Sequence, residues 1–259
     1  MTRILAVTNQ KGGVGKTTTS VNLAAGLAQS GMRVLLVDLD PQGNATMGSG
    51  IDKRTLRISI YQVLLGLATA DSARQKSHSG GYDLIPANRD LAGAEVELVD
   101  LEHRETRLKG ALASVAEQYE FILLDCPPAL NILTLNGLVA ANSVMIPMQC
   151  EYYALEGLSD LVNTIKKIRQ HLNPKLDIEG LLRTMYDPRN ALAQQVSEQL
   201  REHFGKKVYE TVIPRNVRLA EAPSFGAPAV NLDRECKGSQ AYVALAGEIL
   251  SRNGIAAVP

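Results

Sequence analysis

The segment that most constrains this chain is a glycine-rich stretch, Gln10–Thr18, which follows a short apolar run and precedes a helical pattern. Its sequence reads QKGGVGKTT. Gly12, Gly13 and Gly15 lack a Cβ atom, so the backbone can turn tightly and point its N–H groups inward. The helix that begins near Lys16 adds its positive N-terminal dipole at the same place. A strand, a glycine loop and a helix in this order predict a binding site for a polyphosphate.

The end of this stretch assigns chemistry to individual side chains. The Lys16 ammonium can reach the β- and γ-phosphates, and the Thr17 hydroxyl is placed to ligate Mg²⁺. The pattern G-x-x-x-x-G-K-[ST] is matched except at its first position, where Gln10 replaces glycine and Lys11 follows it. Lys11 adds a second cation beside the phosphates, which the simple pattern does not explain. The nucleotide-binding residues predicted from this loop are Lys11, Gly12, Gly13, Val14, Gly15, Lys16, Thr17 and Thr18.

Short apolar runs alternate with amphipathic stretches along the whole chain. Most runs are continuously apolar, which is typical of strands buried on both faces of a parallel sheet. Helical spacing marks the stretch after the loop and the stretch from Leu155 to Leu172, where Asn173-Pro174 ends the pattern. We predict an α/β fold, a single doubly wound and mostly parallel sheet with helices on both faces, formed by one domain over residues 1–259. The predicted strands are Ile4–Thr8, Val34–Asp38, Asp83–Pro86, Phe121–Asp125, Ser143–Pro147, Gly180–Met185 and Val208–Ile213.

Composition narrows the classes of protein that the chain can be. Lysine plus arginine and aspartate plus glutamate both number 27, so the net charge does not favour nucleic acid or membrane, and an anionic partner needs a local basic patch. No apolar run reaches the roughly 18 residues that a membrane span needs. Cys126, Cys150 and Cys236 are widely spaced, which argues against a disulfide scaffold and a zinc site. We expect a soluble, cytoplasmic protein.

Aspartates follow two of the predicted strands directly. Asp38 and Asp40 come at the end of the second strand, and Asp125 ends the strand Phe121–Leu124. Ligands of such folds bind at the carboxyl ends of strands, so Asp125 is predicted to hold Mg²⁺ through a water. Asp38 is predicted to support the loop or a metal-bound water, and Asp40 to orient or deprotonate the attacking water. As an alternative, each aspartate is a turn residue or a helix cap.

Three motifs together resemble those of a known family. They are KGGVGKTT at residues 11–18, DLDPQGN at residues 38–44 and DCPP at residues 125–128. The chain resembles the deviant Walker P-loop ATPases, and among them the ParA/Soj chromosome-partitioning proteins. The likeness continues through residues 149–157 and 213–224, so it covers nearly the whole chain. These later segments are more diagnostic of partitioning ATPases than the loop, which all deviant Walker proteins share.

The resemblance implies a role for Lys11 and a reaction. In this family the corresponding lysine crosses a dimer interface to phosphates bound by the partner subunit, so two ATP molecules lie between two chains of a homodimer. An added cation in a water-excluded interface stabilises charge better than one in solvent. The likeness implies Mg²⁺-dependent hydrolysis of ATP to ADP, with Lys11, Lys16 and Asp40 as catalytic residues. It places the base and ribose near Met185, Pro214 and Asn216.

The resemblance also implies partners. The ATP-bound dimer of this family binds double-stranded DNA without sequence preference, and a ParB-type centromere-binding protein stimulates hydrolysis and release, which implies a location on the nucleoid. Arg189 and Arg218 match basic positions used for DNA. Contacts of this kind go to phosphates and are salt sensitive. The alternative for either arginine is a solvated side chain. The turn at residues 233–237, which carries an acid and a cysteine where the family usually has more basic or small residues, departs from the family pattern, as does a proline at residue 188.

Three other functions use a fold of this class. A membrane-cycling protein of the MinD kind needs a basic amphipathic C-terminal helix, and residues 246–259 contain one arginine and no aromatic residue. An iron–sulfur carrier or nitrogenase-type reductase needs neighbouring cysteines, which this chain lacks at motif spacing. A related positioning ATPase, which places protein clusters or division components, shares the chemistry and stays open as an alternative.

Overall fold

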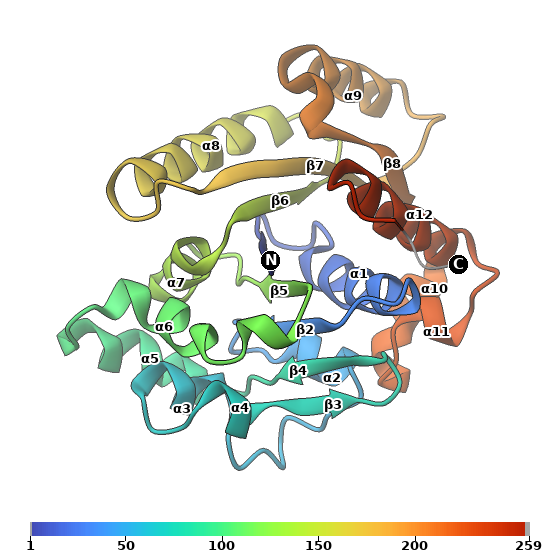
Figure 1. Ribbon diagram of the computed structural model, residues 1–259. Coiled ribbons are helices and arrows are strands. Elements are labelled where there is room, and N and C mark those ends of the chain that lie inside the picture. Colours follow the sequence, from blue (N-terminus) through green and yellow to red (C-terminus); the bar gives the residue numbers. More distant parts are fainter. Residues whose placement is uncertain (1, 257–259) are drawn as a thin grey trace.

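One sheet organises the computed structural model, which describes residues 2–256. Within those residues the sheet has eight strands in the order β3-β4-β2-β5-β1-β6-β7-β8 (Figure 1). Every neighbouring pair is parallel except β3 and β4, which are antiparallel. The strands are β1 (Arg3–Val7), β2 (Val34–Asp38), β3 (Gln75–Ser77), β4 (Tyr82–Ile85), β5 (Phe121–Asp125), β6 (Ser143–Met148), β7 (Asp177–Tyr186) and β8 (Val208–Pro214).

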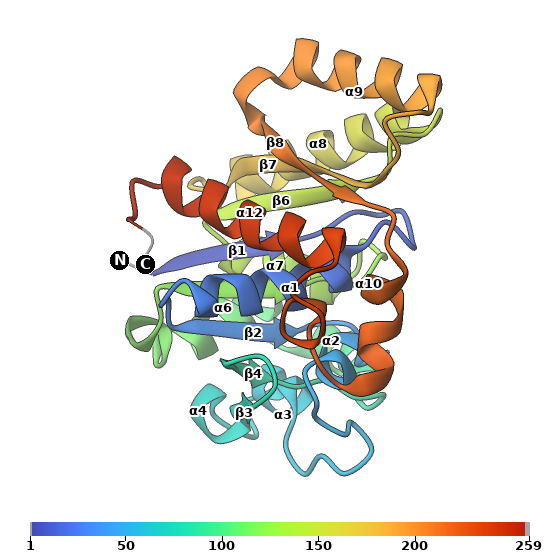
Figure 2. The same ribbon diagram turned by 90° about the vertical axis from the view of Figure 1, so that its right-hand side faces the viewer.

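Helices cover both faces of this sheet, as Figures 1 and 2 show. One layer contains α1 (Lys16–Gln29), α2 (Asn44–Gly48), α10 (Val217–Glu221), α11 (Ala229–Leu232) and α12 (Lys237–Arg252). The other contains α3 (Ile60–Leu65), α4 (Ala70–Ala73), α5 (Leu91–Glu97), α6 (Arg107–Ala113), α7 (Ile132–Ala140), α8 (Ala154–His171) and α9 (Ala191–Phe204). Short 3-10 turns lie at Leu98–Asp100, Arg104–Thr106, Ala116–Gln118, Gly205–Lys207 and Ala222–Phe225.

The central strands β1, β2 and β5 carry continuous apolar runs, at residues 4–7, 34–37 and 121–124, because each face meets one of these helix layers. In β2, Leu35 and Val37 pack with the layer of α3 to α9, whereas Val34 and Leu36 pack with α1 and α12. Successive side chains of a strand point to opposite faces, so a strand covered on both sides shows no alternation. The apolar run in the sequence is therefore the signature of a three-layer fold.

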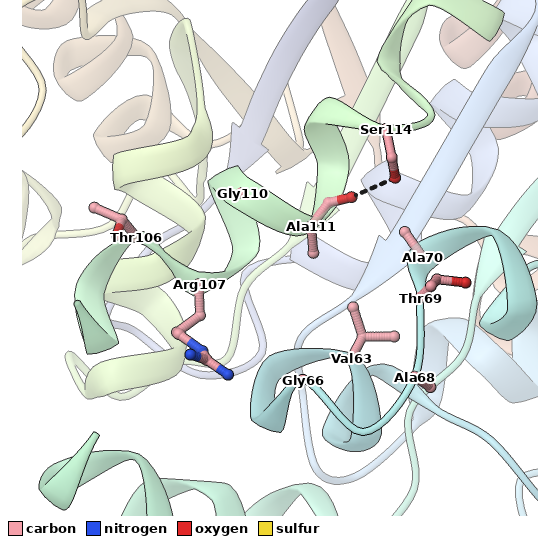
Figure 3. A pocket seen from close by; sticks show the side chains of 10 residues that line it. All are labelled: Val63, Gly66, Ala68, Thr69, Ala70, Thr106, Arg107, Gly110, Ala111 and Ser114. Atoms are coloured by element: carbon pink, nitrogen blue, oxygen red, sulfur yellow. Dashed lines mark hydrogen bonds between the residues drawn. The ribbon is translucent and has the colours of Figure 1, made fainter. Parts of the chain in front are cut away.

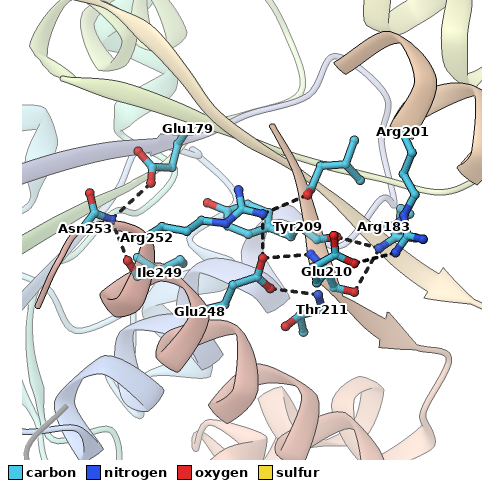
Figure 4. A network of polar contacts seen from close by, with 11 residues as sticks. Glu179, Arg183, Arg201, Tyr209, Glu210, Thr211, Glu248, Ile249, Arg252 and Asn253 are labelled. Carbon is cyan, nitrogen blue, oxygen red and sulfur yellow. Dashed lines mark hydrogen bonds and ion pairs between the residues drawn. The ribbon is translucent and has the colours of Figure 1, made fainter. Parts of the chain in front are cut away.

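Helix α12 is tied to the end strand β8 by a polar network (Figure 4). The Glu248 carboxylate accepts hydrogen bonds from the backbone N–H groups of Glu210 and Thr211, both at 2.9 Å, and Arg252 donates to the Val208 carbonyl at 2.9 Å. The apolar side of α12 is buried against α1 and the sheet, so it is not free to lie on a membrane. Residues 257–259 of the tail with one arginine and no aromatic residue lie outside the described residues. Among the described helices, none combines the length and the apolar character that a membrane span needs.

The predicted α/β class and the seven predicted strands are confirmed, with ends shifted by up to three residues. Strand β7 begins at Asp177 rather than Gly180. The prediction missed its first three residues because Asp177 and Glu179 are polar and this end of the strand is partly exposed. Strand β3 was not predicted. It has three residues, no apolar run, and an antiparallel partner on one side only. Pairing with β4, rather than its own composition, makes this segment a strand.

Candidate nucleotide-binding site

The carboxyl ends of β1, β2 and β5 meet at one edge of the sheet. Asp125 of β5 is paired in register with Val7 of β1 on one side and with Asp38 of β2 on the other. The backbone continues this arrangement, since Leu39 donates to the Asp125 carbonyl at 2.9 Å and Cys126 donates to the Val7 carbonyl at 3.1 Å. Parallel pairing thus brings together the loop after β1 and two of the three predicted carboxylates, Asp38 and Asp125.

The loop after β1 has the shape that its glycines predict. Gly13 and Gly15 adopt φ values of +74° and +86°, a region that L side chains rarely occupy, and Gly15 directly precedes α1. A Cβ atom added to Gly12 or Gly13 would meet nothing within 4 Å, so this side of the loop faces open space. Strand β7, far from the loop in sequence, supports it: the Thr184 hydroxyl donates a hydrogen bond to the Val14 carbonyl at 2.8 Å. The result is an open backbone cradle that fits a phosphate chain.

Lys16 and Thr17 point into the polar centre of this edge. Lys16 is 7% exposed, and its Nζ donates to the Lys11 carbonyl at 3.0 Å. Burial lowers the pKa of Lys16, while the negative charges of Asp125 and Asp40 act in the opposite direction. The Thr17 hydroxyl donates to Asp125 at 2.8 Å. The loop cation and the hydroxyl predicted to bind Mg²⁺ therefore lie together with the predicted carboxylate.

Asp125 is fully buried and bound by two hydroxyls. The second is Ser20, one turn further along α1, which donates to the other carboxylate oxygen at 2.8 Å. Burial raises the pKa of Asp125 to about 7, with the nearby Asp38 charge adding to the effect. Ser20 was not among the predicted site residues, although its spacing of three residues from Thr17 on a helix was a usable signal.

Asp38 and Asp40 differ in environment. Asp38 is fully buried, and one of its oxygens accepts hydrogen bonds from the Thr46 backbone at 2.8 Å and from the Thr46 hydroxyl at 2.7 Å. Its other oxygen accepts from the Asp40 backbone at 3.1 Å, and burial raises its pKa to about 6. Asp40 is partly exposed and accepts from the backbone of Gln42 at 2.9 Å. Asp38 thus braces the segment that presents Asp40.

The three residues predicted to lie near the base and ribose line one cavity. It measures about 170 Å³ and lies beside Gly15 and Thr18, at the ends of β7 and β8. Met185 there has φ +48°, a rare value for a residue with a side chain, and its sulfur accepts a hydrogen bond from Gln149 at 2.9 Å. The residues lining the cavity are Gly15, Thr18, Thr184, Met185, Ile213, Pro214, Arg215, Asn216, Leu219, Ala220 and Tyr242.

Tyr242 and Thr184 were not predicted for this cavity. Tyr242 comes from α12, and its hydroxyl lies 3.0 Å from the Thr19 hydroxyl of α1. Thr184 was inside a predicted strand. Neither position carries a sequence motif, because each reaches the cavity only when β7 and α12 pack beside the loop.

The two predicted DNA-binding arginines are exposed and paired with acids. Arg189 donates to Asp187 of its own turn at 2.8 Å, and this ion pair lowers the pKa of Asp187 to about 2. Arg218 contacts Glu221 at 3.1 Å and Asp233 at 3.2 Å. Asp233 belongs to the turn at residues 233–237, at which the sequence departs from the family pattern. Each arginine therefore reaches a ligand only by leaving a surface ion pair.

The cysteines do not form a metal site in the part of the chain that the structure describes. No group of three His, Cys, Asp or Glu side chains there is arranged to hold a metal ion. Cys126 and Cys150 are buried and Cys236 is partly buried, and burial raises the pKa of the Cys126 thiol. A Mg²⁺ ion bound beside a nucleotide needs only one or two protein ligands, because phosphates and waters supply the others.

A second hollow lies between α3, α4 and α6, away from the glycine loop (Figure 3). Its volume is about 380 Å³, and its lining has one charged side chain, Arg107, whose Nε donates to the Leu64 carbonyl at 2.9 Å. It lacks the carboxylate, the glycine cradle and the second cation found at the sheet edge. The sheet edge is therefore the candidate functional site.

Curated relatives match almost the full length of this chain. A profile of the family described as "AAA domain" matches residues 2–178. The sporulation initiation inhibitor protein Soj of Bacillus subtilis is 54% identical over 96% of this chain and 98% of its own length. The chromosome partitioning protein ParA of Caulobacter vibrioides is 52% identical over 96% of this chain and 94% of its own length.

A solved structure shows the same fold with a nucleotide bound. The cobyrinic acid a,c-diamide synthase of Mycobacterium smegmatis, in a structure with a bound ATP analogue and magnesium, is 41% identical. The superposition has a TM-score of 0.87 and covers 97% of this chain and 95% of the other. The three-layer architecture of this chain is therefore shared with a protein that binds ATP analogue and magnesium.

Proposed function

This chain belongs to the ParA/Soj family of chromosome-partitioning ATPases, and from that premise we propose that it couples Mg²⁺-dependent ATP hydrolysis to dimerisation and DNA binding. In this proposal ATP joins two chains, the dimer binds DNA of any sequence on the nucleoid, and a ParB-type partner stimulates hydrolysis and release. The partitioning relatives are 52% and 54% identical, compared with 41% for the protein named as a synthase, which favours partitioning over amide synthesis.

The observation that carries this proposal is the difference between the two lysines of the loop. Lys16 is 7% exposed and lies in the centre of the site, whereas the Lys11 side chain is 48% exposed and reaches solvent. One lysine is available to the nucleotide of its own chain, and the other to a nucleotide held by a second chain. An ATP-dependent homodimer uses both.

The remaining residues have roles consistent with phosphoryl transfer. When bound, Mg²⁺ neutralises charge on the transferred phosphate. Thr17 would ligate it, and Asp125, hydrogen-bonded to Thr17, would hold a metal-bound water. Asp40 would orient the attacking water from the segment that Asp38 braces. The cavity lined by Met185, Pro214 and Asn216 would take the base and ribose.

A test of this proposal measures mass and DNA affinity together. Light scattering with Mg²⁺ and ATP is expected to give a dimer, and with ADP a monomer. The ATP-bound form is expected to bind two unrelated DNA fragments equally, with an affinity that falls steeply with salt. A monomer in ATP would contradict the proposal, and strong preference for one fragment would favour a sequence-specific regulator.

The positioning ATPase remains the second candidate because both predicted DNA arginines are neutralised by neighbouring acids. An ATP-dependent dimer that shows no salt-sensitive affinity for DNA would favour this candidate. The same pair of measurements therefore separates the two functions.

A further inference from the structure

Lys11 forms an ion pair within its own chain. Its Nζ lies 2.5 Å from Oε2 of Glu151, and the two side chains are 48% and 52% exposed. Glu151 lies just beyond β6, far from Lys11 in the sequence, and β6 is the neighbour of β1 in the sheet. The carboxylate therefore meets the lysine that the proposed function assigns to a partner subunit.

Other contacts hold these two segments against each other. The Asn9 side chain donates to the Pro147 carbonyl at 2.8 Å and accepts from the Lys11 backbone at 3.0 Å. The Gln149 side chain donates to the Gly13 carbonyl at 3.1 Å. The end of β6 thus lies along the loop, and the position of Glu151 next to Lys11 follows from this packing.

We propose that Glu151 is a positioning residue that holds Lys11 in the ATP-free monomer and opposes ATP-driven dimerisation. This inference rests on the proposed function, in which Lys11 leaves its own chain to meet phosphate oxygens bound by a second copy. Glu151 competes with the partner's phosphate oxygens for this ammonium, because a carboxylate held against Lys11 offsets its positive charge and repels the incoming phosphates. Each protomer therefore weakens or gives up its intrachain ion pair when the dimer closes.

The expected size of the effect follows from exposure and symmetry. Half-exposed ion pairs are weak, and breaking one changes an equilibrium by roughly 1.4- to fivefold. A symmetric dimer breaks two of them, so the factors multiply to about two- to thirtyfold in the dimer dissociation constant. An effect of this size shifts the protein concentration at which dimers form without abolishing the monomer.

The test compares Glu151→Gln with wild type at saturating Mg²⁺ and non-hydrolysable ATP analogue. Glutamine keeps the size of the side chain and removes its charge, so the dimer dissociation constant from analytical ultracentrifugation is expected to fall by about two- to thirtyfold. Glu156→Gln is the matched control, because Glu156 is exposed, lies in the first turn of the adjacent α8, and has no ion pair within the described residues. An equal gain in the control, or no gain in Glu151→Gln, overturns the inference.

A second measurement does not depend on dimerisation. Acylation of the Lys11 amine, followed by mass spectrometry in the nucleotide-free protein, is expected to be about 1.4- to fivefold faster in Glu151→Gln than in wild type and Glu156→Gln. Equal rates in all three proteins would overturn the inference. If none of the three proteins dimerises with the ATP analogue, the proposed function is wrong, and the proposed competition for Lys11 is wrong with it. If wild type dimerises and its dimer dissociation constant equals that of Glu151→Gln, only the role of Glu151 is wrong.

Discussion

The phosphate-binding edge and the arginine surface contain similar charged residues in opposite settings. At the edge, Lys16 and Asp125 are buried, and their charged atoms are held by hydrogen bonds within the protein. On the surface, Arg189 and Arg218 are exposed and pair with acids of nearby turns. Burying a charge costs free energy unless the charge is hydrogen-bonded or paired, so the side chains of the edge are held in one arrangement. Exposed ion pairs exchange partners at little cost in free energy. Substitutions should therefore have large, specific effects at the edge and small, additive effects on the surface.

The largest expected effect is at Asp40, the partly exposed member of the edge. Asp40→Ala should bind ATP and dimerise but hydrolyse ATP about 10²- to 10⁴-fold more slowly, because general acid–base groups contribute that much in the transition state. Single-turnover hydrolysis measures this effect, with dimer mass by light scattering as the control for binding. An unchanged rate would mean that another group positions the water.

The next effect is at Lys16, which tests the buried cation. Lys16→Ala should weaken ATP binding by roughly thirtyfold or more and so remove ATP-dependent dimerisation, because a buried charge loses its counter-ion. Titration calorimetry with ATP and light scattering are the measurements. A variant that still dimerises with ATP would remove Lys16 from this role.

The two settings should also differ in pH dependence. Burial raises the pKa of Asp125, so between about pH 4 and pH 7 the folded state holds a proton that the unfolded state has released, and stability falls as pH rises. In the nucleotide-free protein, the melting temperature of Asp125→Asn minus that of wild type should therefore rise by a few degrees as the pH increases from 5 to 8.

Asp187→Asn is the surface counterpart of that experiment. The pKa of Asp187 is lowered to about 2 by Arg189, so its contribution to stability is lost only as the pH falls below about 4. The difference in melting temperature between Asp187→Asn and wild type should therefore stay constant between pH 5 and pH 8. If the melting temperatures of both variants differed from wild type by a constant amount across this pH range, the ionisation of Asp125 would not control stability.

The smallest effect per residue is expected on the arginine surface. Arg189→Ala with Arg218→Ala should spare dimerisation, weaken binding to any DNA, and lower the salt slope by about one unit per lost phosphate contact. Arg33→Ala is the matched control, since Arg33 is also exposed and acid-paired but precedes β2 at the other end of the sheet. Equal slopes for double variant, control and wild type would show that these arginines are solvated surface.

Removing an acid sharpens the same comparison. Asp233→Asn frees Arg218 from one of its two carboxylates, so the variant should bind DNA more tightly by a few-fold at low salt. An unchanged affinity would place Arg218 outside the DNA contact. Fluorescence anisotropy at low and physiological salt is the measurement.

Much of the fold was predictable because its determinants are local. The apolar runs of β1, β2 and β5 and the glycines before α1 predicted a parallel sheet with a phosphate loop, and the sheet order confirms that class. Strand β3 was missed because three polar residues become a strand only when β4 is beside them. That residues 1–259 form one domain stays a prediction.

The sequence by itself determined the backbone chemistry of the loop and the types of residue at the ends of the strands. Glycine at positive φ, lysine before a helix and aspartate after a buried strand are constraints that neighbouring residues impose. The tertiary structure decided which other groups meet them: Ser20 at Asp125, Thr46 at Asp38, and Glu151 at Lys11. The first and last of these pairings depend on strand order and helix packing, since separations of more than a hundred residues are closed only when the sheet forms.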